Sequence, residues 1–346
     1  MRGEHPKILF VGDAWLGSNA RSLANGFREA GATTIQIDTT PISRPKRLSP
    51  SWIYLKTGGR RSPGTLAAVH EQIERLAAVE RPDVLFCFKT IHLDQDRLLG
   101  LPIRTKVHYS ADDVSNPINT TPEYMKREHE WDLIVTTKRH NVDEVRERTG
   151  REPLFVWSAY DRAWHHPFAQ NSESLALVSF IGNMRPDRRD FMVDLADKYG
   201  KGLRLLGPGW NSIPQLRRSP AFVGRGVYGE DFSREVARSR AHLILLNSDN
   251  RDTHTCRSFE VPAAGGLFVG QRTSEHQQLI DDGETGYLFD NADELHDIID
   301  RVSSEPEKSA KIAWRGYKHI ASAKNDYRAR AEEILRHLDY GGGMRA

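Results

Sequence analysis

The chain has 346 residues, a length that suggests about two domains at the usual size of roughly 150 residues each. Its hydrophobic content of 38% and its charged content of 28% are typical of a globular protein with sizeable cores. The formal net charge of +2 gives no argument for a nucleic-acid partner, and we expect none. No apolar run approaches the ~20 residues that span a bilayer, and the N-terminus lacks the apolar region of a secretory signal. We therefore expect a cytoplasmic protein.

The cysteines and histidines give no sign of a bound metal. Cys87 and Cys256 form neither a disulfide framework nor a zinc-binding spacing. Cys87 lies within the apolar run VLFCF, where a buried thiol is expected. The adjacent His165 and His166 have no carboxylate at helical spacing that would complete a metal site, so they are expected to be structural. We expect neither a metal nor another cofactor.

Short apolar runs alternate with amphipathic segments in the first half of the chain. The runs expected to be buried strands begin at Lys7, Val84, Lys106 and Asp132. Residues 20–31 and 65–79 instead place apolar side chains three and four positions apart, which predicts helices.

The same alternation returns in the second half. Further strands are expected at residues 176–182, 203–207, 242–247 and 267–271. Further helices are expected at residues 191–200, 231–241, 258–266, 292–304 and 307–338. Strands that alternate with helices in this way predict parallel sheets that are covered on both faces.

The fold class that these elements predict is α/β, with two Rossmann-like, doubly wound domains facing a cleft. The N-terminal domain is expected at residues 1–165 and the C-terminal domain at residues 166–325. Residues 326–346 hold the end of the last helical pattern and a tail that is expected to be flexible. Ligands of such sheets bind beyond the carboxyl ends of the strands, so two substrates could meet in the cleft.

The densest group of polar residues spans residues 247–266 and begins where the expected strand at 242–247 ends. Glu260 falls on the helix expected next, where its carboxylate can accept two hydrogen bonds from a vicinal diol such as that of ribose. Asp252 lies in the preceding loop and could reach a second hydroxylated ligand. On the pattern alone, each acid could equally cap a turn or be solvated.

This stretch, NSDNRDTHTCRSFEVPAAGG, resembles the nucleotide-sugar signature of retaining GT-B glycosyltransferases of the family 4 type. It resembles more closely the CgeB-like, or spore-maturation-like, branch, which reads DNRDTHT-x-RSFE at this place. The wider family has two glutamates eight positions apart, then an A-x-G turn, and a later segment similar to DDGETGYLF at residues 281–289. Here Asp252 takes the first acidic position, Glu260 the second, and Gly265 and Gly266 lie in the turn.

The resemblance implies roles for these residues. Glu260 would bind the ribose hydroxyls of the donor, and Asp252 would lie near the transferred sugar or its phosphate as a catalytic residue. The Gly265-Gly266 turn would belong to the nucleotide-binding site. Three further side chains could contact the donor, since a cation near a diphosphate offsets its charge, although surface charge or a loop cap explains them equally well: Arg251, His254 and Arg257.

A second motif, FIGNMRPDRRD at residues 180–190, lies at the first strand–helix junction of the expected C-terminal domain. A helix start favours phosphate but disfavours cations, so the arginines gathered there indicate that an anion is expected. The family grips the donor pyrophosphate here with G-R-l-x-x-x-K. Gly182 aligns with the glycine and Arg188 with the lysine, while Arg185 would replace the arginine and Arg189 would add to the cluster. A surface role for the arginines stays open.

Two later loops hold further candidates for the nucleotide site. Gly207 lies in the GPGW loop, where the family has a G-x-G loop close to the base or phosphate. Tyr228 lies in VGRGVYGEDF, the segment that leads to the base-binding strand in the family, and could approach the nucleobase. A simple turn explains GPGW equally well.

In the expected N-terminal domain, two loops that follow strands carry candidates. Gly17, Ser18 and Asn19 follow the first strand without forming a full dinucleotide fingerprint, and the family uses this loop against the donor phosphates or the acceptor. The segment HYSADD offers His108, Asp112 and Asp113, and the family often places a histidine or an acid here near the donor sugar. Alternatively, these residues cap the next turn.

The activity that the resemblance implies is transfer of a sugar from a nucleotide-diphosphate-sugar to an acceptor hydroxyl, with retained configuration and without a bound metal. Arg188, with Arg185 or Arg189, would stabilise the departing pyrophosphate. The donor phosphate would accept the proton of the acceptor, so no separate base is needed. The last helix would return towards the N-terminal domain.

Other functions and the partners stay open at this stage. A nucleotide-sugar epimerase, or a non-catalytic sugar-nucleotide-binding or assembly protein, could use the same pocket. The acceptor could be a glycan, a lipid-linked molecule or a small molecule, and the sequence gives no oligomeric state. Residues 39–70 hold no acid. The basic residues 44–61 within them could contact an inner membrane surface peripherally, bind an acidic acceptor or form a solvated loop.

Overall fold

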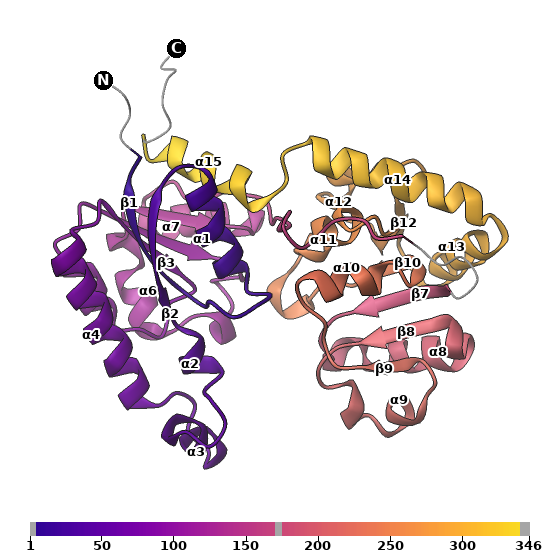
Figure 1. Ribbon diagram of the computed structural model, residues 1–346, viewed down its shortest axis with the longest axis horizontal. Helices are drawn as coiled ribbons and strands as arrows, with labels where there is room; N and C mark the ends of the chain where they lie inside the picture. The colour runs from indigo at the N-terminus through magenta and orange to yellow at the C-terminus, as the bar shows by residue number, and fades with distance from the viewer. Residues whose placement is uncertain (1–4, 170–174, 340–346) are drawn as a thin grey trace. The chain divides into compact units, whose positions relative to one another are not determined.

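The computed structural model describes residues 5–169 and 175–339 (Figure 1). They form two compact units: the first comprises Met1–Trp157 with Tyr327–Ala346, and the second comprises Ser158–Asp326. The sequence analysis placed the boundary between the two domains after residue 165 instead, and those domain bounds stay a prediction. The tail expected to be flexible, residues 341–346, lies outside the described residues.

The first unit is built on a six-stranded sheet in the order β2-β1-β3-β4-β5-β6, and all of its strand pairs are parallel. Its strands are β1 Lys7–Gly12, β2 Thr33–Asp38, β3 Val84–Phe88, β4 Thr105–Ser110, β5 Leu133–Thr136 and β6 Leu154–Phe155. Flanking helices are α1 Asn19–Glu29, α2 Thr40–Ser43, α3 Pro50–Lys56, α4 Pro63–Glu80, α5 Gln95–Leu99, α6 Pro122–Arg127, α7 Arg139–Thr149 and α15 Tyr327–His337.

The buried strands of the first unit are the ones that the sequence predicted. Every side chain of β3 and nearly every one of β1 is buried, because helices cover both faces of a parallel sheet. β2 and β6 were missed. β2 is an edge strand whose side chains are mostly half-exposed, so it contains no continuous apolar run.

The second unit contains a six-stranded sheet in the order β12-β11-β10-β7-β8-β9, again with parallel pairs throughout. Its strands are β7 Ala176–Ile181, β8 Leu203–Leu206, β9 Phe222–Gly224, β10 Ser239–Ile244, β11 Phe268–Gln271 and β12 Tyr287–Phe289. The helices are α8 Arg189–Tyr199, α9 Pro214–Arg218, α10 Glu230–Val236, α11 Arg257–Ala263, α12 His276–Leu279, α13 Ala292–Ser304 and α14 Pro306–Ser322. The α/β class with two doubly wound sheets is thereby confirmed.

Two of the predicted helices have different bounds in the structure. The helix expected at residues 231–241 ends at Val236, because Ser239 and Ala241 already belong to β10 and pair with β7. The long helical segment expected at residues 307–338 is two helices, α14 and α15. Between them the backbone of Lys324 is left-handed, with φ of 53°, which interrupts the helical hydrogen bonds.

Helix α15 packs directly on α1 within the first unit. A Cβ atom on Gly26 of α1 would lie 2.3 Å from the carbonyl oxygen of Tyr327, so only glycine allows the two backbones to approach this closely. Ile334 and Leu335 on α15 are buried as well. The last described helix is therefore a structural part of the first unit.

Candidate functional site

The second sheet has a topological switch point between β7 and β10, the neighbouring strands from which the strand order runs in opposite directions. In open parallel sheets, ligands bind in the crevice outside the carboxyl ends of the strands at such a point. β7 ends at Ile181 and β10 ends at Ile244. The two motifs found in the sequence, residues 180–190 and 247–266, run on from these two strand ends, so the fold brings them to the same edge of the sheet.

Arg188 ties the loops after β7 and β10 together. It ends the short 3-10 turn Pro186–Arg188 and is only 7% exposed. Its Nη2 donates to the carbonyl oxygen of Leu246 at 2.9 Å and to Oδ1 of Asn247 at 2.8 Å. Burial lowers the pKa of Arg188, while the carboxylate of Asp187 acts in the opposite direction. An arginine stays charged at any pH near neutrality, so the site holds a buried cation.

Asn247 extends this connection to Asp252. Its Nδ2 donates to Oδ2 of Asp252 at 2.7 Å, and the backbone N–H of Asp252 donates to the carbonyl oxygen of Asn247 at 3.1 Å. Arg188, Asn247 and Asp252 thus form one hydrogen-bonded cluster, which we call the Arg188–Asn247–Asp252 cluster. Sequence reasoning did not single out Asn247; the signal for it was its place as the first residue of the polar stretch that follows β10.

The same two loops are joined at a second place. Arg185 forms an ion pair with Asp249, and Ser248 Oγ donates to Oδ2 of Asp187 at 2.5 Å. Arg189, by contrast, is the exposed first residue of α8 and pairs with the neighbouring Asp190 at 2.7 Å. The structure therefore brings Arg185 into the site together with the cluster, whereas Arg189 pairs only with its neighbour Asp190 among the described residues.

Helix α11 brings Arg257 and Glu260 to the end of β7. Arg257 Nε donates to the carbonyl oxygen of Ile181 at 3.1 Å, and its guanidinium lies 4.4 Å from the ring centre of Phe232. Its Nη1 also forms an ion pair with Glu260. Glu260 is 6% exposed and lies in the first turn of α11, where the helix dipole stabilises a carboxylate.

Gly182 and Gly207 hold the loops after β7 and β8 against each other. Gly207 has φ of 145°, and a Cβ atom on it would lie 1.9 Å from the carbonyl oxygen of Gly182. That oxygen also accepts a hydrogen bond from Trp210 Nε1 at 2.8 Å. Gly207 is thus required by close backbone packing beside the switch point, whereas a Cβ atom on Gly182 would lie 2.7 Å from the ring of Phe180.

Gly265 and Gly266 follow the end of helix α11. Gly265 has φ of 80°, and a Cβ atom on Gly266 would lie 2.6 Å from the ring of His242. Turn geometry and packing account for both glycines without a ligand. Tyr228 lies in the segment before α10 and is half-buried, with its hydroxyl 2.9 Å from the place of a Cβ atom on Gly226.

His254 and Arg251 lie on the loop that carries Asp252. His254 is 1% exposed, with Nδ1 2.7 Å from Oε2 of Glu275, while Nε2 accepts the backbone N–H of Ser158 at 3.2 Å. Both ring nitrogens are therefore engaged inside the second unit, and contact with a donor would break one of these bonds. Arg251 is exposed and has a left-handed backbone, with φ of 45°.

The first unit holds the remaining candidates. Gly17, with φ of 91°, turns the chain into α1, of which Asn19 is the first residue. Ser18 is 7% exposed, and its Oγ donates to the carbonyl oxygen of Asp13 at 3.1 Å. The three residues follow β1, beside the switch point of the first sheet between β1 and β3.

His108 and Asp112 have different surroundings. His108 is fully buried within β4 and contacts the rings of Tyr124 and Trp131, and burial lowers its pKa to about 3. The catalytic role of His108 stays a prediction, and the burial of its side chain does not favour that role. Asp112 lies beyond the end of β4 and forms an ion pair with Lys89. Asp113 is buried and accepts a hydrogen bond from Asn141 Nδ2 at 2.8 Å.

Within residues 5–169 and 175–339, no group of three or more His, Cys, Asp or Glu side chains is placed to hold a metal ion. Over the same residues, no helix combines the length and apolar character that crossing a bilayer requires. Cys87 is buried as expected, and burial raises the pKa of its thiol to about 12.

The comparison with protein families gives one match. Residues 185–336, which run from the Arg188 turn to α15, match the family model described as glycosyl transferase-like. A comparison with curated proteins gives no match. The closer resemblance to the CgeB-like branch stays a hypothesis.

Solved structures with the same fold cover nearly the whole chain. HepE of Anabaena in complex with UDP-glucose matches with a TM-score of 0.66 and 14% identity over 97% of this chain and 100% of that one. Sucrose-phosphate synthase from Thermosynechococcus elongatus matches with a TM-score of 0.68 and 11% identity, over 97% of this chain and 98% of that one. A glycosyltransferase from Rickettsia africae matches with a TM-score of 0.65 and 10% identity, over 98% of this chain and 100% of that one. The fold is thus that of the GT-B glycosyltransferases, with two Rossmann-like domains, and at these identities the likeness concerns the fold alone.

Proposed function

We propose that this protein is a glycosyltransferase whose nucleotide-diphosphate-sugar donor binds at the switch point of the second unit. The observation that carries the proposal is that the carboxyl ends of β7 and β10 gather the Arg188–Asn247–Asp252 cluster and the Arg257–Glu260 pair. All five residues lie inside the segment that matches the glycosyl transferase-like family model. The general rule that open parallel sheets bind ligands beyond strand ends at a switch point supports the proposal.

The charges of the site suit a nucleotide diphosphate. Arg185, Arg188 and Arg257 supply three guanidinium groups for the two phosphates, and Arg188 Nε has no hydrogen-bond partner among the described residues. A buried donor without a partner is rare, and a phosphate oxygen would satisfy it after a small shift of the loop. Glu260 would exchange its ion pair with Arg257 for hydrogen bonds from the ribose hydroxyls, while Arg257 turns to the diphosphate.

The chemistry we propose is sugar transfer with retained configuration and without a bound metal. As the glycosidic bond breaks, negative charge grows on the departing diphosphate, and fixed guanidinium groups stabilise that charge in the transition state. The leaving phosphate oxygen accepts the proton of the acceptor hydroxyl on the same face. Asp252, held by Asn247, would accept hydrogen bonds from hydroxyls of the transferred sugar.

The first test is nucleotide binding. Thermal unfolding is measured with UDP, GDP, dTDP, CDP and ADP, and a ligand that binds the folded state alone raises Tm. UDP is the first candidate, because the Anabaena protein of the same fold was crystallised with UDP-glucose. Glu260→Ala should abolish the increase in Tm that the wild type shows. Glu307→Ala, which removes an exposed acid from the first turn of α14, is the matched control and should leave it unchanged.

The second test is turnover. The wild type should release UDP from UDP-glucose slowly in water and faster with an acceptor, and NMR of the product should show retained anomeric configuration with the rate unchanged by EDTA. The absence of any nucleotide-induced change in Tm would overturn the proposal. Conversion of the donor to its epimer would support an epimerase, and binding without turnover on any acceptor would support a sugar-nucleotide-binding protein.

The acceptor and its location are proposals as well. Leu48 and Ile53 on the basic segment 44–61 expose 71% and 51% of their surface, which supports peripheral contact with an anionic membrane. A lipid-linked acceptor would suit such contact.

A further inference from the structure

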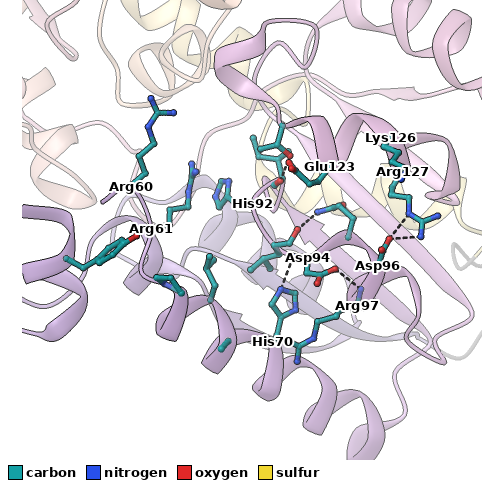
Figure 2. Close-up of a pocket in the computed structure, with 18 residues that line it drawn as sticks. Arg60, Arg61, His70, His92, Asp94, Asp96, Arg97, Glu123, Lys126 and Arg127 are labelled. Atoms are coloured by element: carbon teal, nitrogen blue, oxygen red, sulfur yellow. Dashed lines mark hydrogen bonds and ion pairs between the residues drawn. The ribbon is translucent and has the colours of Figure 1, made fainter. Parts of the chain in front are cut away.

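A large pocket lies entirely within the first unit, and the end of the basic segment 44–61 forms part of its lining. It has a volume of about 820 Å³, which is within the ~300–1,000 Å³ typical of small-ligand sites. The segment between α3 and α4, the start of α4, the loop after β3, and helices α5 and α6 form its walls (Figure 2). Sequence reasoning noted the basic segment 44–61 but did not predict this pocket.

One end of the pocket is cationic. Arg60 and Arg61 line it from the acid-free stretch of residues 39–70, and neither has an acidic partner among the described residues. Figure 2 shows them at the same end as His92. Burial, helped by the charges of Arg61 and Lys89, lowers the pKa of His92 to about 4. His92 is therefore neutral at pH 7, so the charge at this end of the pocket comes from Arg60 and Arg61.

The other end of the pocket contains acids as well as bases, but most of these are already paired. Arg97 is held by Glu74 at 2.7 Å, and Arg127 pairs with Asp96 at 2.5 Å. Their charges are thus compensated within the protein.

Two other carboxylates of this end remain open to a ligand. Asp94 uses one oxygen to cap α5, where Oδ1 accepts the backbone N–H of Arg97 at 3.1 Å. Glu123 is exposed in the first turn of α6 and has no ion pair among the described residues. Carboxylates are pure acceptors, so these two would bind hydroxyl groups and not an anion.

We propose that this pocket binds a polyhydroxylated ligand that carries a phosphate group, with the phosphate held by Arg60 and Arg61 and the hydroxyls by Asp94 and Glu123. Guanidinium groups match phosphate oxygens with paired N–H donors, and an ionised acceptor strengthens each bond. The same chemistry is offered by a free sugar phosphate and by the headgroup of a phosphorylated inositol lipid. If the ligand is the acceptor of the transfer, that role rests on the function proposed above.

The test is isothermal titration of the full chain with glucose 6-phosphate, glucose and inorganic phosphate. Glucose 6-phosphate should bind more tightly than either fragment, because it engages both ends of the pocket. R60Q/R61Q should weaken its binding about tenfold or more, since two charge-assisted bonds are lost. E123Q should weaken binding of glucose 6-phosphate but not of inorganic phosphate. R75Q, which removes an exposed arginine of α4 outside the pocket, is the matched control. It should change the binding of neither glucose 6-phosphate nor inorganic phosphate.

A vesicle arm distinguishes the two sources of the ligand. The protein is sedimented with phosphatidylcholine vesicles that contain phosphatidylinositol 4-phosphate. If the wild type binds these vesicles, R60Q/R61Q does not, and glucose 6-phosphate does not bind, the result supports the proposal and assigns the lipid source. Equal binding of every probe by the wild type and R60Q/R61Q, or binding of none, would overturn it.

The test of this pocket can be separated from the test of the proposed donor site. R60Q/R61Q should retain UDP binding, and Glu260→Ala should retain binding of glucose 6-phosphate. Failure of both glucose 6-phosphate and the phosphatidylinositol 4-phosphate vesicles to bind, with UDP still bound, would sink this inference alone. Failure of every nucleotide, with the sugar phosphate still bound, would sink the donor proposal alone.

Discussion

The guanidinium of Arg188 is bonded to two acceptors of the loop after β10, the carbonyl oxygen of Leu246 and Oδ1 of Asn247. We predict that Arg188→Ala weakens binding of UDP by about 2–4 kcal/mol, because a desolvated charge partner of the diphosphate is removed and the loop is released. Binding of uridine should fall much less. Isothermal titration with the two ligands measures the difference.

Two variants show whether charge or geometry accounts for the effect of Arg188. Arg188→Lys keeps the charge but cannot bridge Leu246 and Asn247 while it faces a ligand. Its affinity for UDP should therefore lie between those of Arg188→Ala and the wild type. Arg218→Ala removes an exposed arginine from α9 and should change neither affinity. Equal losses for UDP and uridine would contradict a diphosphate role for Arg188.

His108 gives a prediction on stability and pH. Its folded-state pKa of about 3 is far below the ~6.5 of an exposed histidine. Between these two pH values the unfolded chain holds one more proton at this residue, so stability falls as the pH falls below about 6.5. His108→Phe fits the same aromatic surroundings and should reduce the pH dependence of the unfolding free energy by about 1.4 kcal/mol per pH unit.

The His108 prediction is checked by urea unfolding at pH 5 to 8. His319→Phe, at an exposed position of α14, is the control and should keep the wild-type dependence. An unchanged slope in His108→Phe would show that the pKa of the ring is the same in the folded and the unfolded protein, and would restore His108 as a candidate for proton transfer.

At the residue scale, the sequence was informative where a motif follows a strand. The arginines of residues 185–189 and the acids of residues 252–260 could be placed at strand ends, because a parallel sheet exposes that edge. Which arginine is buried could not be read, since this depends on contacts between two loops that lie far apart in the sequence. His108 shows the opposite case: a polar residue near a strand end that aromatic packing draws into the core.

At the scale of elements, the loop after β8 is fixed by one glycine. We predict that Gly207→Ala lowers the free energy of unfolding by about 1–3 kcal/mol and weakens UDP binding, because its Cβ atom would collide with the carbonyl oxygen of Gly182. The loop that leads to Arg185 and Arg188 would then shift. Gly224→Ala on β9, whose added Cβ atom meets nothing within 4 Å, should be nearly silent. Urea unfolding and UDP titration measure both effects, and loss of stability without loss of UDP binding would separate this loop from the donor site.

Among the elements, hydrophobic periodicity found the central strands of both sheets and missed those at the edges. Central strands are buried on both faces and read as apolar runs. The edge strand β2 and the two-residue β6 have no such run, so their existence depends on pairing with neighbours. The end of α10 was misplaced for the same reason, because Ser239 and Ala241 join β10 through their pairing with β7.

At the scale of the whole molecule, two series of alternating elements were enough to predict two doubly wound sheets. The order of the strands was not predictable, because it is set by pairings between distant segments. That order is what locates the switch point between β7 and β10, and hence the candidate donor site. The second half of the final helical segment likewise became α15 of the first unit, since its apolar face packs there on α1.

The return of α15 makes a prediction on how the two units unfold. Ile334→Ala should destabilise the first unit by about 2–5 kcal/mol, because the isoleucine is fully buried and a cavity remains. Hydrogen exchange should then speed up in β1, β3 and α1, while β7 and β10 keep their protection, since the contacts of α15 lie in the first unit. Arg336→Ala, at an exposed position of the same helix, should leave both units unchanged. Equal loss of protection in the two sheets would instead show that the units unfold as one, so that the loops carrying Arg188 and Asp252 depend on the far end of the chain.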